Sequence, residues 1–167
     1  MNNIKNVCVY SASSTKIAPV YFAVAEELGR LLASKGINLI NGAGSIGLMG
    51  TTSNAALAAG GTVTGVIPRF MVEQNWHHNG LTQLIETETM HERKQLMAEM
   101  SDGVIALPGG CGTMEELLEM LQRAIDGNFM RPEHRAIWLV ATSAQEAIDL
   151  LHTTPWWNKN VRKFAAI

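Results

Sequence analysis

Short apolar runs rich in valine and isoleucine alternate along this chain with longer segments whose apolar residues recur at helical spacing. This alternation is typical of βαβ units, in which helices cover both faces of a parallel sheet. We therefore predict an α/β fold, a Rossmann-like doubly wound parallel sheet with helices on both faces. The strands that we expect cover residues 7–10, 37–41, 62–67, 83–86, 104–107 and 136–140.

Helices are expected between these strands. Pro19 is well placed to begin the first helix, because proline fits the first helical turn, and Gly36 is well placed to end it. The apolar residues between them recur at helical spacing, which predicts a face packed on the sheet rather than a binding site. The other expected helices cover residues 48–59, 90–100, a segment that starts at 113, and 144–152.

The composition is that of an ordinary globular domain. The chain has 167 residues, 47% of them hydrophobic, and we expect a single Rossmann-like nucleotide-binding domain over residues 1–167. Thirteen Lys and Arg against fifteen Asp and Glu give a net charge of -2 without a basic run. We therefore expect no nucleic-acid partner.

Other features argue against membrane, disulfide and metal-binding classes. No stretch approaches the roughly 18 apolar residues of a spanning helix, and the N-terminus lacks the apolar core of a signal peptide, so we expect no membrane partner. Cys8 and Cys111 form no C-x-x-C pair, which favours a cytoplasmic protein. His77 and His78 are adjacent rather than four residues apart, so no metal site is expected.

Glycine-rich or serine-rich turns follow three of the expected strands, at residues 10–14, 41–47 and 108–112. The carboxyl ends of parallel strands meet at one edge of a sheet, and ligands of such folds bind there. We therefore expect all three turns at the same edge.

The most informative turn lies between Leu107 and Glu116 and reads Leu-Pro-Gly-Gly-Cys-Gly-Thr-Met-Glu-Glu. Its glycines allow backbone N–H groups to approach an anion, and a helix that begins near Thr113 points its positive end at the same place. A phosphorylated sugar with its reactive carbon near Glu116 fits this arrangement. A capping box fits it as well, with Thr113 and Glu116 satisfying only the first N–H groups of the helix.

Gly42, Gly44 and Gly47 satisfy the dinucleotide pattern G-x-G-x-x-G between a strand and a helix. The acidic residue that should hold a ribose hydroxyl about 20 residues later is missing from the sequence. Arg69 would then meet the 2′-phosphate of NADP, so an NADP-binding protein is a third interpretation of the chain.

Two motifs together resemble the Lonely Guy (LOG) family of cytokinin riboside 5′-monophosphate phosphoribohydrolases, formerly described as lysine decarboxylase-like. The family patterns P-G-G-x-G-T-x-x-E and M-H-E/Q-R-K are complete at residues 108–116 and 90–94. Weaker similarities lie in the same order, so that the resemblance covers residues 6–140. No lysine stands out as a Schiff-base site for pyridoxal phosphate, and no cofactor is expected.

The resemblance implies that Arg93 and Glu116 form the catalytic pair and that the substrate is a nucleoside 5′-monophosphate. Cleavage of an N-glycosidic bond develops positive charge on the ribose, which a carboxylate can stabilise. The family's phosphate-binding positions correspond to Gly110, Gly112 and Thr113. The other residues expected to bind substrate are Ser13, Gly44, Met90, Lys94, Gly109 and Cys111.

The resemblance also implies a homodimer. Its subunits would pack through the helices around residues 90–100 and 113–126. Methionine side chains offer adaptable apolar surface there, at Met97, Met100, Met114 and Met120.

The chain departs from the family where members carry T-W-x-Q-L-G after the catalytic helix. Gln122, Arg123, Ile125 and Asp126 stand at these positions, and Asn75 replaces a usual glutamate. The family motifs that bind phosphate and ribose are retained in this chain, but the sequence does not identify the base that it accepts. These replacements motivate a runner-up from another class, a non-catalytic carrier of a phosphorylated ligand or cofactor, of the molybdenum-cofactor-carrier type.

Overall fold

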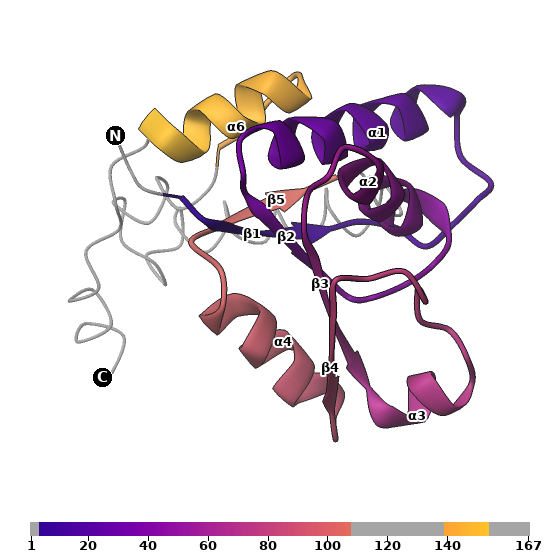
Figure 1. Ribbon diagram of the computed structural model, residues 1–167. Coiled ribbons are helices and arrows are strands. Elements are labelled where there is room, and N and C mark those ends of the chain that lie inside the picture. Colours follow the sequence, from indigo (N-terminus) through magenta and orange to yellow (C-terminus); the bar gives the residue numbers. More distant parts are fainter. Residues whose placement is uncertain (1–3, 108–138, 154–167) are drawn as a thin grey trace, which may run out of the picture.

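The computed structural model describes residues 4–107 and 139–153, which form a parallel sheet with strand order β4-β3-β2-β1-β5 (Figure 1). The predicted parallel α/β sheet is confirmed, and the five strands lie within one residue of their expected bounds. They are β1 (Asn6–Tyr10), β2 (Asn38–Asn41), β3 (Val63–Pro68), β4 (Gln83–Thr87) and β5 (Gly103–Ala106).

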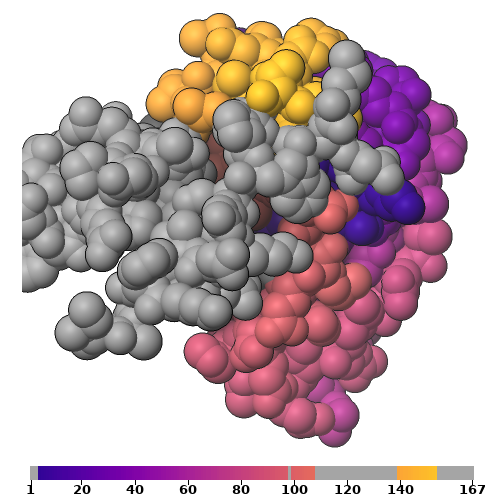
Figure 2. Space-filling view, turned by 90° about the vertical axis from the view of Figure 1, so that its left-hand side faces the viewer, coloured from indigo at the N-terminus to yellow at the C-terminus, as the bar shows by residue number. Residues whose placement is uncertain are grey.

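Helices cover both faces of this sheet, as predicted. Helices α1, α2 and α6 lie on one face and α4 lies on the other (Figure 1). In the space-filling view, the orange and yellow surface of α6 lies above the rose and salmon surface of the α4–β5 segment (Figure 2). The bounds are α1 (Pro19–Ser34), α2 (Gly47–Ala58), α3 (Arg69–Glu73), α4 (Met90–Glu99) and α6 (Ala144–Thr153).

Two hydrophobic clusters form the core, one on each face, because successive strand residues point to opposite sides. Val7 packs with Leu28 and Leu32 of α1 and with Ile148 of α6. The next strand residue, Cys8, packs instead with Ile40, Val66 and the α4 residue Met97. This division of β1 between two cores is what the doubly wound pattern requires.

Some expectations need correction. Met97 is only 2% exposed and packs in the chain's own core, so it does not offer surface to a second subunit. Helix α3 was not expected, because five residues are too short to show a helical period. Leu139 and Val140 belong to no strand, and the rest of the strand expected at 136–140 lies outside the described residues, as does the helix expected from Thr113. No helix among residues 4–107 and 139–153 is long and apolar enough to cross a membrane.

Candidate functional site

The turns after β1 and β2 meet at the carboxyl edge of the sheet, as expected. The N–H of Leu48 donates to the carbonyl of Ala12 at 3.0 Å. Gly47 has a φ of 64°, and a Cβ there would lie 2.6 Å from the carbonyl oxygen of Ser13. Only glycine allows the two turns to pack this closely.

The third predicted turn, at residues 108–112, lies outside the described residues, but the strand that leads into it is described. Tyr10 pairs with Ala106 in the parallel register of β1 and β5. Beyond that pair, the N–H of Leu107 donates to the Tyr10 carbonyl at 2.9 Å. The chain therefore enters the glycine motif from the same edge of the sheet.

A buried asparagine fixes the turn after β2. The Oδ1 of Asn41 accepts the N–H of Ala43 at 2.9 Å, and its Nδ2 donates to the Oγ of Ser53 in α2 at 2.8 Å. Ala43 is fully buried with a φ of 63°, a conformation that is rare outside glycine. The side chain of Asn41 thus holds a turn that its neighbours alone would not favour.

Arg93 reaches from the first turn of α4 into this same turn. Its Nε donates to the carbonyl of Val66 at 3.0 Å, and its Nη2 donates to the carbonyl of Gly42 at 3.1 Å. Its Nη1 lies 3.7 Å from the sulfur of Met90. A Cβ at Gly42 would overlap Nη2 and lie 2.8 Å from Cζ, so the missing side chain at Gly42 makes room for the guanidinium.

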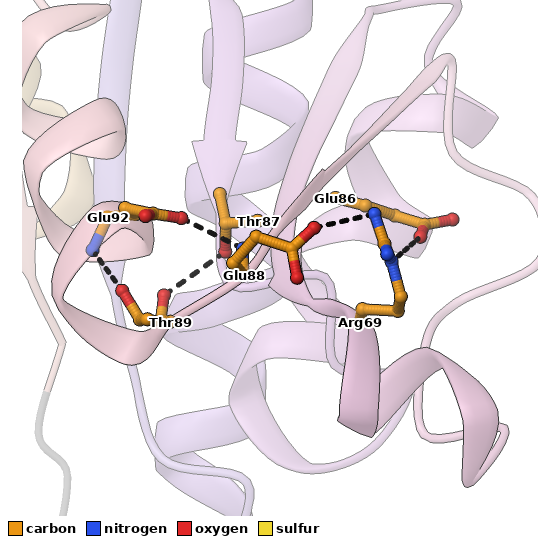
Figure 3. A network of polar contacts seen from close by, with 6 residues as sticks. All are labelled: Arg69, Glu86, Thr87, Glu88, Thr89 and Glu92. Atoms are coloured by element: carbon orange, nitrogen blue, oxygen red, sulfur yellow. Dashed lines mark hydrogen bonds and ion pairs between the residues drawn. The ribbon is translucent and has the colours of Figure 1, made fainter.

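A capping network sets the start of α4 and therefore the position of Arg93. The N–H of Glu92 donates to the hydroxyl of Thr89 at 3.1 Å, and the Glu92 carboxylate accepts the N–H of Glu88 at 2.9 Å (Figure 3). The sequence reasoning missed this cap, although the capping signature of Thr followed three residues later by Glu is present at Thr89 and Glu92.

Burial and neighbouring groups shape the electrostatics beside Arg93. Burial lowers the pKa of Arg93, while Tyr10 and Cys8 act in the opposite direction. Arginine remains protonated despite such shifts, so this edge carries a cation. Burial, followed by the influence of Cys8, raises the pKa of Tyr10, which keeps its phenol protonated at neutral pH. Tyr10 was not among the expected site residues, although it shares a face of β1 with buried Cys8 and ends the strand.

The predicted residues divide into those that the structure describes and those that it does not. Gly44 lies in the turn that binds Arg93, and Met90 is 38% exposed beside the guanidinium. Ser13 is exposed in the adjoining turn, and Lys94 is exposed on α4 next to Arg93. The predicted residues outside the described part are Gly109, Gly110, Cys111, Gly112, Thr113 and Glu116.

Arg69, the cation of the NADP interpretation, is engaged by carboxylates. Its Nη2 lies 2.6 Å from Glu88 and its Nε lies 3.7 Å from Glu86 (Figure 3). These two carboxylates offset the positive charge of Arg69, which the 2′-phosphate of NADP would need. Within the described ranges, no group of three His, Cys, Asp or Glu side chains is placed to hold a metal ion.

Comparison with known proteins adds sequence and fold relationships. A family model described as "Possible lysine decarboxylase" matches residues 49–125. A cytokinin riboside 5′-monophosphate phosphoribohydrolase of Arabidopsis thaliana is 35% identical, over 90% of this chain and 78% of that protein. One from Rhodococcoides fascians is 47% identical over 70% of this chain and 60% of that protein.

Solved structures share the fold. The molybdenum cofactor carrier protein of Chlamydomonas reinhardtii matches with a TM-score of 0.68 and 23% identity, over 90% of this chain and 97% of that one. The molybdenum cofactor binding protein of Rippkaea orientalis matches with a TM-score of 0.68 and 22% identity, over 89% and 96%. At these identities the likeness supports the fold alone.

Proposed function

The chain belongs to the LOG family of cytokinin riboside 5′-monophosphate phosphoribohydrolases, and from this membership we propose that it hydrolyses a purine nucleoside 5′-monophosphate. The substrate is AMP or an N6-substituted, cytokinin-type AMP. Water adds to C1′ as the N-glycosidic bond breaks, and the products are the free base, which takes up a proton, and ribose 5-phosphate.

The structural observation that supports this proposal is the fixed cation at the sheet edge. The Nε and one N–H of Nη2 of Arg93 donate to two backbone carbonyls, which fixes the plane of its guanidinium. The remaining N–H groups can hold ribose hydroxyls or a carboxylate in one geometry, which a flexible lysine would do less well. Catalysis depends on such preorganised groups placed where charge develops.

Glu116 supplies the complementary charge in this proposal. As the bond to the base lengthens, the ribose acquires oxocarbenium character, and a carboxylate near C1′ stabilises it or orients water. The glycines of residues 109–112 and Thr113 would hold the 5′-phosphate, as the family motif implies. No cofactor takes part in this hydrolysis.

The test is to incubate the purified protein with AMP and with isopentenyl-AMP and to separate the released base by chromatography. We expect stoichiometric base and ribose 5-phosphate. A folded protein that releases base from neither nucleotide would contradict the proposed reaction.

The carrier interpretation has one specific observation in its favour, the replacement of family residues by Gln122 and Arg123. A carrier would bind a phosphorylated ligand tightly without turnover, and Glu116→Ala would leave that binding unchanged. Calorimetry with AMP, run beside the chromatographic assay, therefore separates the two functions.

We further propose a cytoplasmic homodimer. The exposed surface of α4, together with the segment at 113–126, would form its interface. Light scattering at micromolar concentration should give about twice the chain mass of 18.2 kDa. A monomeric mass would remove this part of the proposal.

A further inference from the structure

Tyr10, the last residue of β1, lies on the same face of the sheet as Arg93. Residues two apart in a strand point to the same side, so Tyr10 shares the side of Cys8. Cys8 packs with Met97 of α4, the helix that carries Arg93 (Figure 1). Tyr10 is 39% exposed, so a bound molecule can reach its side chain.

The strand pairing places Tyr10 beside the turn that holds Arg93. The parallel pairing of β1 with β2 reaches Cys8 and Ile40. The same register, continued by two residues, puts Tyr10 level with Gly42, whose carbonyl accepts Nη2 of Arg93 at 3.1 Å. The phenol and the guanidinium therefore approach the same point of the sheet edge, one from β1 and the other from α4.

The electrostatics of the two side chains agree with this placement. Burial lowers the pKa of Arg93, and the largest opposing influence comes from Tyr10. Burial, followed by Cys8, raises the pKa of Tyr10, and the positive charge of Arg93 opposes this rise. Charges more than about 10 Å apart are largely screened, so this mutual influence is that of neighbouring groups. The phenol keeps its proton at neutral pH and can donate a hydrogen bond.

The other neighbour of β1 leads into the glycine motif. Tyr10 pairs with Ala106 of β5, and the N–H of Leu107 donates to the Tyr10 carbonyl at 2.9 Å. The segment at 108–116, to which the proposed function assigns the 5′-phosphate, follows directly. Because β1 stands between β5 and β2 in the sheet, Tyr10 lies between the start of this segment and the turn that holds the guanidinium.

We propose that the hydroxyl of Tyr10 donates a hydrogen bond to the 3′-hydroxyl of the nucleotide ribose, an inference that rests on the proposed function. The ribose joins the 5′-phosphate to C1′, so it spans the interval that Tyr10 occupies. The 3′-hydroxyl lies next to C4′, which carries the phosphate arm, whereas the 2′-hydroxyl lies next to C1′. A hydrogen bond to the ring oxygen would oppose the positive charge that develops there.

The experiment measures by calorimetry how tightly the wild type and Tyr10→Phe bind AMP, 2′-deoxy-AMP and 3′-deoxy-AMP. The substitution keeps the ring and removes only the hydroxyl. The dissociation constants of AMP and 2′-deoxy-AMP should rise about 5-fold, as expected for the loss of one hydrogen bond. The dissociation constant of 3′-deoxy-AMP should not change, because this nucleotide lacks the oxygen that Tyr10 contacts.

Tyr21→Phe is the matched control, because Tyr21 is the only other tyrosine of the chain. It lies on α1 and packs against the core on the opposite face of the sheet. This variant should bind all three nucleotides as the wild type does. Thermal melting checks that each variant is folded, and Tyr10→Met serves if Tyr10→Phe does not fold.

Equal weakening of all three nucleotides by Tyr10→Phe would overturn the contact, as would unchanged AMP affinity in the folded variant. Weakening that disappears with 2′-deoxy-AMP instead of 3′-deoxy-AMP would move the contact to the other hydroxyl and so contradict the proposal. The selective pattern in a protein that releases no base would support the contact and contradict the hydrolysis. Base release by the wild type, with unchanged AMP affinity in Tyr10→Phe, would support the hydrolysis and overturn the contact.

Discussion

Replacement of Gly42 by alanine should displace Arg93. The added Cβ would lie 2.8 Å from the Cζ of Arg93 and overlap Nη2. Carbon atoms pack at about 3.5–4.0 Å, so the guanidinium must withdraw by at least about 1 Å, and Nη2, which the Cβ overlaps, must move further. This stretches the hydrogen bond from Nη2 to the Gly42 carbonyl, now 3.1 Å, beyond hydrogen-bonding range. Because a misplacement of about 1 Å can cost on the order of 10²-fold in rate, we expect kcat/KM for AMP to fall by that factor.

The assay measures base release from AMP together with thermal melting. Overpacking costs about 1–3 kcal/mol, and the melting temperature of a domain this size falls by about 2–4 °C per kcal/mol. In Gly42→Ala/Arg93→Ala the clash is gone, so the melting temperature should recover while turnover stays at the level of Arg93→Ala.

Gly60→Ala controls for a loss of stability without a clash at Arg93, because Gly60 has a φ of 77° and an added Cβ there meets nothing within 4 Å. This variant should lose some stability and keep its turnover. Wild-type melting and wild-type turnover in Gly42→Ala would refute the argument that the guanidinium needs this space.

Glu116→Gln should lower kcat by on the order of 10² or more while AMP affinity stays nearly unchanged, since the amide keeps the shape and loses the charge; near-normal turnover would return Glu116 to a capping role. Gly110→Val should abolish AMP binding in calorimetry while the melting temperature shows a folded protein, and retained binding would place the phosphate elsewhere. Burial raises the pKa of Cys8 above its ordinary value of 9.0, so the unfolded chain loses this proton first and stability should fall as pH rises above 9.0 towards the folded pKa. The free energy of unfolding should fall by at most about 1.4 kcal/mol per pH unit. Urea titrations at pH 8 and 10 should show a smaller fall in Cys8→Ala than in the wild type.

The sequence predicted the sheet well because buried parallel strands are continuous apolar runs. Strand β3 (Val63–Pro68) is buried along its whole length and was placed within one residue. Helix α3 was missed because its five residues carry no period. Local sequence patterns thus predict only those elements that are long enough for their apolar residues to show a period.

The candidate site was harder to predict, because its contacts join residues far apart in sequence. Arg93 and Gly42 are separated by 51 positions, and nothing near either residue indicates their hydrogen bond. The family motif drew attention to Arg93, but the role of Gly42 was visible only in three dimensions. The bridge between His77 and Gly44 was likewise not predicted, because it joins two segments that are far apart in the sequence.

The glycines at 42, 44 and 47 show that a sequence motif can be interpreted only when the atoms that face each glycine are known. In a dinucleotide loop, such glycines let the backbone approach a pyrophosphate. Here the space beside Gly42 is filled by Arg93, and the space beside Gly47 is filled by the turn that contains Ser13. The first and last glycines of the pattern therefore serve packing within the chain. Because the space beside Gly42 holds a guanidinium at the sheet edge, the pattern supports a site built around a fixed cation, as in the hydrolysis proposed above, rather than a cradle for a second phosphate.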